Sequence, residues 1–138
     1  MRVLVPIDET RASEAALTEA VRLVAGTDDG AIILVTVGAL AETSAQADSS
    51  RAALGKRLTS IAARLAPLPV ETRVELAGDP VQGILDVAGE VHADRIVMAT
   101  EHEGFWEALA DGRGVSGEVT NRAALPVRVL DMRQSDID

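Results

Sequence analysis

Short runs of β-branched and aliphatic residues alternate with stretches of helical periodicity along this chain, and that alternation constrains its fold most strongly. The apolar runs cover residues 3–7, 32–37, 70–76, 96–99 and 126–130. Between them, apolar residues recur every three or four positions, which is the spacing of one helix face. Because strands that alternate with helices need right-handed crossovers, the pattern predicts an α/β fold. We expect a single-domain, open, five-stranded parallel sheet with helices on both faces.

Helix boundaries follow from breakers and capping residues. The spacing predicts helices over residues 11–25, 51–65 and about 116–124, and a further helix that begins at Pro80 behind the N-cap residue Asp79. The small, polar residues 38–50 predict a mobile loop. His92 is expected to close the helix that Pro80 opens, where a C-terminal dipole favours an imidazolium.

Two further features concern the edges of the domain. Residues 70–76 alternate apolar and charged side chains, which predicts an edge strand with one solvent-exposed face. The domain is expected to span residues 1–131, with residues 132–138 as a disordered tail. A length of 138 residues fits one such domain.

Composition excludes several classes of protein. The chain has no cysteine, so disulfides, thiolate zinc sites and cysteine nucleophiles are excluded. No apolar run reaches the roughly 18–20 residues of a membrane span, and the N-terminus MRVLVPIDET lacks the features of a signal peptide. We therefore expect a cytoplasmic protein without membrane insertion.

The net charge of −9 argues against nucleic acid as a partner, because phosphates repel an acidic surface. Lys56 is the only lysine among thirteen basic residues. A GC-rich genome, which favours arginine codons, explains this bias. Adaptation to high salt, where an acidic and lysine-poor surface keeps a protein soluble, explains it as well.

A first candidate site lies at the carboxyl ends of the strands. Ligands of open α/β sheets bind there, at the point where the strand order reverses. If the first strand is central, Asp8 projects into that crevice and Met98, Ala99 and Thr100 face it. Asp8 is then a hydrogen-bond acceptor for a ribose or a base; the alternative is that it helps to start the following helix.

The segment DGRGVSGE, residues 111–118, is the second candidate. Its glycines allow close approach to backbone amides, the following helix offers its N-terminus to a phosphate, and Arg113 adds a charge. The alternative is a surface turn in which Ser116 caps that helix. The segment lacks the spacing of a P-loop.

Three segments in order resemble the universal stress protein family. RVLVPIDET resembles its first strand, with the pattern Pro-x-Asp-x-Ser/Thr. ELAGDPVQGILDVAGEVHADRIVMAT resembles its central turn, helix and fourth strand, and residues 119–130, ending in PVRVL, resemble its closing strand. The resemblance implies a Rossmann-like fold of the adenine nucleotide alpha hydrolase type.

The resemblance also implies a nucleotide site. Members that bind ATP carry Gly-x-x-Gly, nine residues and Gly-Ser/Thr after the fourth strand. Matched by position, the implied ligand-binding residues are Pro6, Asp8, Val37, Met98 and Ala99, and the third Gly of the pattern falls on Gly112 or on Arg113, depending on the end from which it is counted. The Gly-Ser/Thr pair itself is absent; Ser116 is the nearest hydroxyl, and Gly114 of the same segment completes the candidate phosphate contacts. The implied cofactor is ATP or another adenine nucleotide.

The chain departs from that glycine pattern. Ala99 replaces the usual first Gly, His102 stands at the second, and the loop carries one extra residue. Four acidic residues, Glu101, Glu103, Glu107 and Asp111, repel a triphosphate unless a divalent cation bridges them. His102 with its neighbouring glutamates is a weak ligand set, so we expect no metal site.

Three functions fit these observations. The first is a stress-response binding module without turnover and without catalytic residues, a homodimer that pairs through the last strand at residues 126–130. The second is a weak ATP-hydrolysing or nucleotide-transferring enzyme of the same fold group. The third is an interaction subunit that binds no small ligand.

Overall fold

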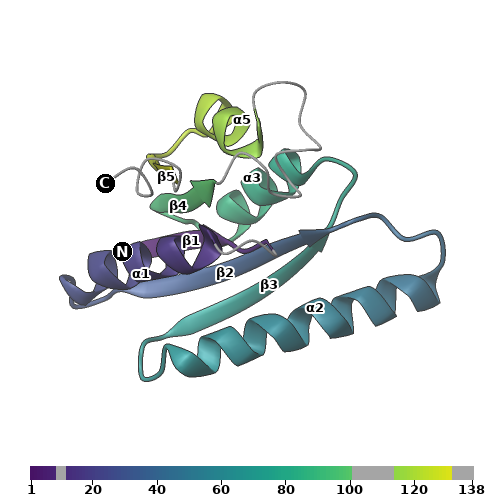
Figure 1. The fold of residues 1–138 in the computed structure, drawn as a ribbon, viewed down its shortest axis with the longest axis horizontal. Helices are drawn as coiled ribbons and strands as arrows, with labels where there is room; N and C mark the ends of the chain where they lie inside the picture. The colour runs from purple at the N-terminus through teal and green to yellow at the C-terminus, as the bar shows by residue number, and fades with distance from the viewer. Residues whose placement is uncertain (9–11, 101–113, 132–138) are drawn as a thin grey trace.

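A computed structural model describes residues 1–8, 12–100 and 114–131 (Figure 1). It confirms the predicted alternation of strands and helices. Its elements in chain order are β1 (Arg2–Pro6), α1 (Ala12–Ala25), β2 (Ala31–Gly38), α2 (Ser44–Arg64), β3 (Val70–Leu76), α3 (Pro80–Glu90), β4 (Arg95–Thr100), α5 (Gly114–Arg122) and β5 (Val127–Asp131). The expected tail, residues 132–138, lies outside the described part of the chain.

The five strands form one sheet in the order β3-β2-β1-β4-β5, and every described pair of neighbours is parallel. The chain thus moves outward through β2 and β3, then returns past β1 to β4 and β5. The reversal falls between β1 and β4. Helices α1 and α2 cover one face and α3 and α5 the other, as Figure 1 shows.

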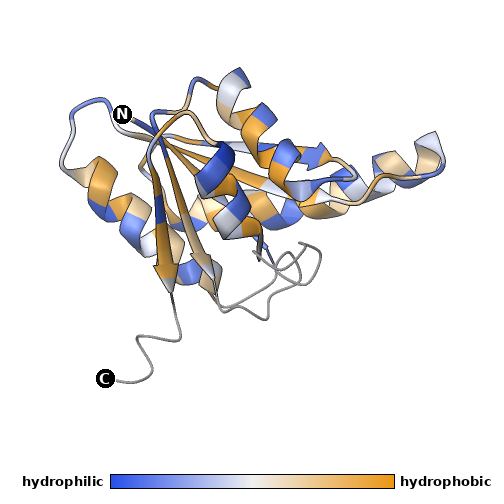
Figure 2. Cartoon of the chain, turned by 90° about the horizontal axis from the view of Figure 1, so that it is seen from above, coloured by the Kyte–Doolittle hydropathy of each residue, from blue (hydrophilic) through white to orange (hydrophobic). Residues whose placement is uncertain are grey.

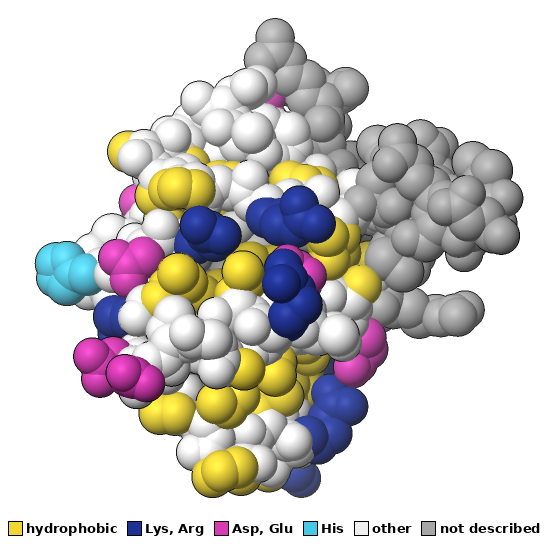
Figure 3. Space-filling view, turned by 90° about the vertical axis from the view of Figure 1, so that its left-hand side faces the viewer, with side chains coloured by type: hydrophobic (Ala, Val, Ile, Leu, Met, Phe, Trp, Pro, Cys, Tyr) yellow, Lys and Arg dark blue, Asp and Glu magenta, His cyan; other side chains and the backbone are white. Residues whose placement is uncertain are grey.

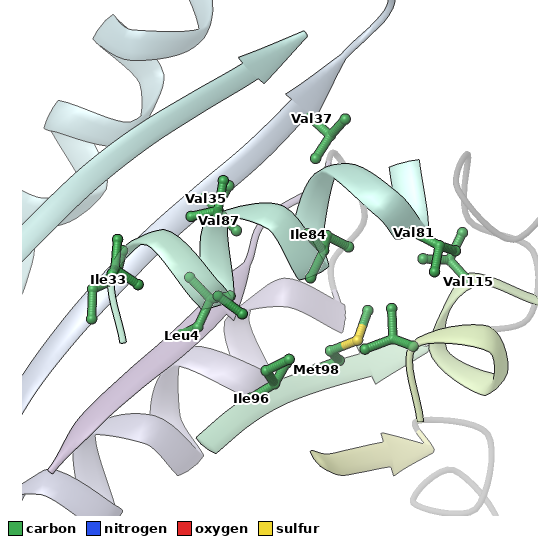
Figure 4. Close-up of a cluster of buried hydrophobic side chains, with 13 residues drawn as sticks. Leu4, Ile33, Val35, Val37, Val81, Ile84, Val87, Ile96, Met98 and Val115 are labelled. Carbon is green, nitrogen blue, oxygen red and sulfur yellow. The ribbon is translucent and has the colours of Figure 1, made fainter. Parts of the chain in front are cut away.

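Each face of the sheet has its own hydrophobic core, because side chains of a strand alternate between the two faces. On the α3 side, Leu4, Ile33 and Ile96 pack against Ile84 and Val87 (Figure 4). On the α1 side lies a second cluster that includes Val3, Val5, Ile32, Leu34, Leu17 and Leu58. In Figure 2 the central strands are accordingly apolar while the helices are polar outward. Strands buried on both faces are typical of parallel sheets.

The position of β3 agrees with its sequence pattern. It is an edge strand of the sheet, and Val70 and Val74 pack on the core beneath α2. Glu71, on the opposite face, is exposed. The predicted edge strand with one wetter face is confirmed.

The predicted loop over residues 38–50 is wrong in its second half, because α2 begins at Ser44. Thr43 is the N-cap residue, and its hydroxyl accepts a hydrogen bond from the Gln46 N–H at 3.1 Å. The Gln46 side chain in turn accepts one from the Glu42 N–H at 3.1 Å. These bonds resemble a capping box, which starts the helix without any apolar periodicity.

Both ends of α3 are fixed by specific residues. Asp79 accepts hydrogen bonds from the N–H groups of Val81 and Gln82 at 2.9 and 3.3 Å, and Pro80 occupies the first turn, as expected. At the other end, His92 has a φ of 54°. The His92 and Ala93 N–H groups bond to the carbonyls of Gly89 and Ala88, which is a Schellman motif.

The surface charge is not uniform despite the net charge of −9. Figure 3 shows arginine side chains, acidic side chains and apolar patches mixed over one end of the molecule. Several arginines form ion pairs with acidic residues, as in Arg73 with Glu90 and Arg2 with Glu71. No described helix is both long and apolar enough to cross a membrane.

Candidate ligand-binding site

The reversal of the strand order places the candidate crevice at the carboxyl ends of β1 and β4. These two strands are neighbours, and the helices that follow them, α1 and α5, cover opposite faces of the sheet. Ligands of open α/β sheets commonly bind at the carboxyl ends of two such strands. Four of the predicted site residues, Pro6, Asp8, Met98 and Ala99, lie at or directly beyond these tips.

Asp8 follows β1 and is held by the first turn of α1. The Ser13 hydroxyl lies 3.0 Å from Asp8 Oδ1 and donates to it, while the Asp8 N–H donates to Ser13 Oγ at 3.1 Å. Ser13 is itself buried, so this contact fixes the carboxylate relative to the core. The carboxylate of Asp8 is thus partly exposed and bonded to the first turn of α1. This geometry agrees both with a ligand-binding role of Asp8 and with a role in starting the helix.

Val37 is positioned by the extra length of β2. The last pair between β1 and β2 joins Pro6 to Val35, and the Ile7 N–H donates to the Val35 carbonyl at 2.7 Å. Gly38, by contrast, accepts from Ala77 on the β3 side. Because backbone groups alternate along a strand, the N–H and C=O of Val37 point to the same side as those of Val35. They face the space beyond the end of β1, where Asp8 lies.

The side chains near the tip of β4 diverge. Met98 is buried in the core beneath α3 and α5, as Figure 4 shows, whereas Ala99 packs toward α1. Thr100, the last residue of β4, is also buried. Met98 and Ala99 therefore lie on opposite faces of the sheet.

The second candidate segment is only partly described. Gly112 and Arg113 lie outside the described residues, as do Glu101, His102, Glu103, Glu107 and Asp111. Gly114 is the first residue of α5 and Ser116 its third. The capping interpretation of Ser116 is wrong, because the helix begins two residues earlier and Ser116 is buried within its first turn.

A metal site has no support in the described part of the chain, where no three His, Asp or Glu side chains are grouped closely enough to bind an ion.

Sequence reasoning missed one feature beside Asp8. A hollow of about 330 Å³ opens between α1 and α2, and its lining includes Ile7, Asp8, Glu14, Leu17, Arg57 and Ile61. Arg57 enters this group only because α2 packs beside α1. No local motif marks such a residue, so nothing in the sequence identifies it.

A parallel sheet with this strand order, covered on both faces by helices, defines a doubly wound α/β domain. The sequence profile of the universal stress protein family matches residues 1–131. The chain belongs to the universal stress protein family. No curated protein sequence matches it.

Solved structures share this fold. A universal stress family protein from Burkholderia pseudomallei superposes with a TM-score of 0.72 at 23% identity, covering 94% of both chains. A universal stress protein in complex with cAMP gives 0.69 at 20% identity, covering 95% of this chain and 96% of the other. A longer universal stress protein from Archaeoglobus fulgidus gives 0.64 at 23% identity; the match covers 94% of this chain but only 43% of that protein.

Proposed function

We propose that this protein is a regulatory binding module that holds an adenine nucleotide in the crevice at the tips of β1 and β4, without turnover. The observation that carries the proposal is the direction of the Val37 backbone. One residue presents a donor and an acceptor side by side, beyond the end of β1. The edge of adenine carries a complementary pair, the N6 amino donor beside the N1 acceptor.

The remaining groups of the crevice fit the rest of a nucleoside. The Asp8 carboxylate, tethered by Ser13, accepts hydrogen bonds from ribose hydroxyls. Ala99 is half-buried and leaves room beside the sugar, while Pro6 and Met98 are buried and support the strand ends from within the protein. A relative of the same fold was solved in complex with cAMP, which supports an adenine ligand of this size.

The phosphate end belongs to the N-terminus of α5. Gly114 opens this nine-residue helix, whose first N–H groups and dipole favour an anion. Gly112, Arg113 and Ser116 complete the proposed phosphate contacts. The altered glycine pattern favours a monophosphate or cyclic nucleotide over ATP, because fewer charges then meet the acidic residues of the 101–111 segment.

Calorimetric titration with AMP, cAMP, ADP and ATP, with and without Mg²⁺ and in both low and molar salt, tests this proposal. We expect binding of AMP or cAMP and a weakening of about tenfold or more in Asp8→Asn, which loses a charged acceptor. Asp48→Asn, on the exposed outer part of α2, is the matched control and should bind like the wild type.

The other outcomes separate the competing functions. Steady phosphate release that Asp8→Asn abolishes would indicate an enzyme instead. Absence of heat with all four nucleotides would contradict the proposal and favour an interaction subunit that binds no small ligand.

We also propose that the protein forms a homodimer through β5. This strand lies at the edge of the sheet, and an open edge is commonly covered by a second copy. Light scattering should give twice the mass of 14.4 kDa. Val129→Pro removes one backbone donor from β5 and should shift the protein toward monomer; a monomeric wild type would contradict the proposal.

A further inference from the structure

Helix α5 is attached to the rest of the protein through one of its faces. Val115 and Val119, four residues apart, are fully buried in the cluster that also contains Val81 of α3 and Met98 of β4 (Figure 4). Arg122, the last residue of α5, follows three residues later and therefore lies on the same face. The helix is thus held by two valines and, at its end, by one long polar side chain.

Arg122 contacts two residues at the start of α3. Its Nη2 donates to Gln82 Oε1 at 2.5 Å, and its Nη1 lies 3.5 Å from Asp79 Oδ2. Two contacts from one planar guanidinium fix a direction as well as a distance. Apolar contacts are not directional, so the two valines do not fix the rotation of α5 about its own axis. The orientation of α5 relative to α3 therefore depends on Arg122.

Both partners of Arg122 are themselves held in place. Asp79 Oδ1 accepts the N–H groups that cap α3, those of Val81 and Gln82, while Oδ2 faces Arg122. The side-chain amide of Gln82 donates to Asp86 Oδ1 at 2.7 Å, which turns its oxygen toward Arg122. The first turn of α3 is consequently a fixed support for the end of α5.

The same turn of α3 also supports the adenine side of the crevice. A Cβ at Gly83 would lie 3.1 and 3.2 Å from the two γ carbons of Val37, so α3 packs closely on the residue that we assign to adenine. Val37 thus packs on α3 directly, whereas the first turn of α5, which we assign to the phosphate, is oriented on α3 through Arg122. A change at Arg122 would disturb the second arrangement and leave the first intact.

We propose, on the basis of the nucleotide site proposed above, that Arg122 is a positioning residue that makes this site select phosphorylated over unphosphorylated adenosine. Arg122 holds the first turn of α5 in the orientation in which its N–H groups meet a phosphate. Hydrogen bonds weaken steeply when donor and acceptor are misaligned, so a small rotation of α5 weakens the phosphate contacts. The nucleoside part, held at Val37, is not affected by this rotation.

Calorimetric titration of the full chain with AMP and with adenosine tests the proposal. We expect Arg122→Gln to bind AMP about five- to tenfold more weakly than the wild type, the scale of one or two hydrogen bonds, and to bind adenosine equally well. Arg122→Lys should lie between the two, because an ammonium keeps the charge but lacks the planar donors. Gln82→Met removes the acceptor without any change of charge and should also weaken AMP binding. Arg122 and Gln82 are exposed, so these variants are expected to fold.

Arg22→Gln is the matched control, because it removes the same charge from the last turn of α1, near the amino ends of the strands and away from the crevice. It should bind both ligands like the wild type. Unchanged AMP binding in Arg122→Gln, or equal losses of AMP and adenosine, would overturn the positioning role. Full recovery of AMP binding in Arg122→Lys would overturn it as well, since charge alone would then suffice. A wild type that binds neither ligand would contradict the nucleotide site itself, and this inference with it.

Discussion

The side chain of Asp94 and the backbone of Arg2 close the sheet between β1 and β4. The Arg2 N–H donates to Asp94 Oδ2 at 2.8 Å, and the Asp94 N–H donates to the Arg2 carbonyl at 2.8 Å. The Arg2 side chain adds a bond from Nε to the Val91 carbonyl at 2.8 Å. These contacts lie at the amino ends of the strands, opposite the crevice. Asp94 thus helps to fix the position of β4 along β1, and this position determines where the carboxyl ends of the two strands lie relative to each other.

Replacing Asp94 with Ala should therefore destabilise the fold. The Arg2 N–H would lose a charged acceptor, and we expect a loss of about 1–2 kcal/mol in the free energy of unfolding. Urea denaturation followed by circular dichroism measures this. Asp48→Ala, on exposed α2, removes the same charge at a site with no such bond; similar losses in the two variants would contradict a specific role for Asp94.

The left-handed residue at the end of α3 gives a prediction of opposite sign. His92 holds a φ of 54°, which costs a residue with a Cβ about 1 kcal/mol relative to glycine. His92→Gly should raise the free energy of unfolding by about 0.5–1 kcal/mol, whereas the β-branched His92→Val should lower it. Thermal melting of the two variants beside the wild type gives the order; a loss of stability in His92→Gly would show that the imidazole itself stabilises the helix end.

Two glycines of α3 should respond differently to the same substitution. A Cβ at Gly83 would lie 3.1 and 3.2 Å from the two γ carbons of Val37, whereas a Cβ at Gly89 meets no atom within 4 Å. Alanine in a helix gains up to about 1 kcal/mol over glycine, but overpacking costs about 1–3 kcal/mol.

Gly89→Ala should consequently stabilise the protein and Gly83→Ala destabilise it, in chemical denaturation. Equal gains in the free energy of unfolding at both positions would contradict this prediction. They would mean that α3 moves away from Val37 at little cost, so that the helix and the strand are not closely packed beside the proposed adenine contact.

The sequence predicted most of the fold because its strands are buried and its shorter helices are amphipathic. Hydrophobic periodicity therefore located β1, β2, β4 and α3, and alternation located β3 at an edge. Hydrophobic periodicity did not locate the start of α2, because Leu58 is the only buried residue of this helix. The spacing of Thr43 and Gln46 was the available signal there, since it marks a capping box rather than a hydrophobic face.

For the candidate site, the sequence could predict only those residues that a local pattern marks. Asp8 and Met98 follow from strand ends, since carboxyl ends of parallel strands share one edge. The direction of the Val37 backbone depends on β2 being longer than β1, which composition does not reveal. Arg57 depends on how two helices pack, and helix packing brings together residues that no sequence spacing relates.

A last prediction concerns acid stability at the link between α1 and β5. Glu19 Oε2 accepts from Arg22 Nε at 3.1 Å, and its other carboxylate oxygen pairs with Arg22 and lies 3.4 Å from Arg128 Nε. The hydrogen bond from Arg22 lowers the pKa of Glu19 below its ordinary value of 4.5, and the charges of Arg22 and Arg128 act in the same direction, while partial burial opposes them.

Because the folded pKa is lowered, the contribution of Glu19 to stability is complete above pH 4.5 and is lost as the pH falls through the lowered pKa. Glu19→Gln should therefore reduce the free energy of unfolding by about 0.5 kcal/mol at pH 7, the scale of a surface ion pair, and by less at pH 3. Urea titrations at both values measure the difference. Glu42→Gln, at an exposed position, is the matched control for the loss of one carboxylate. A Glu19→Gln deficit that persists unchanged at pH 3 would mean that the amide disturbs the packing of α1 against β5, and that the ion pairs themselves contribute little.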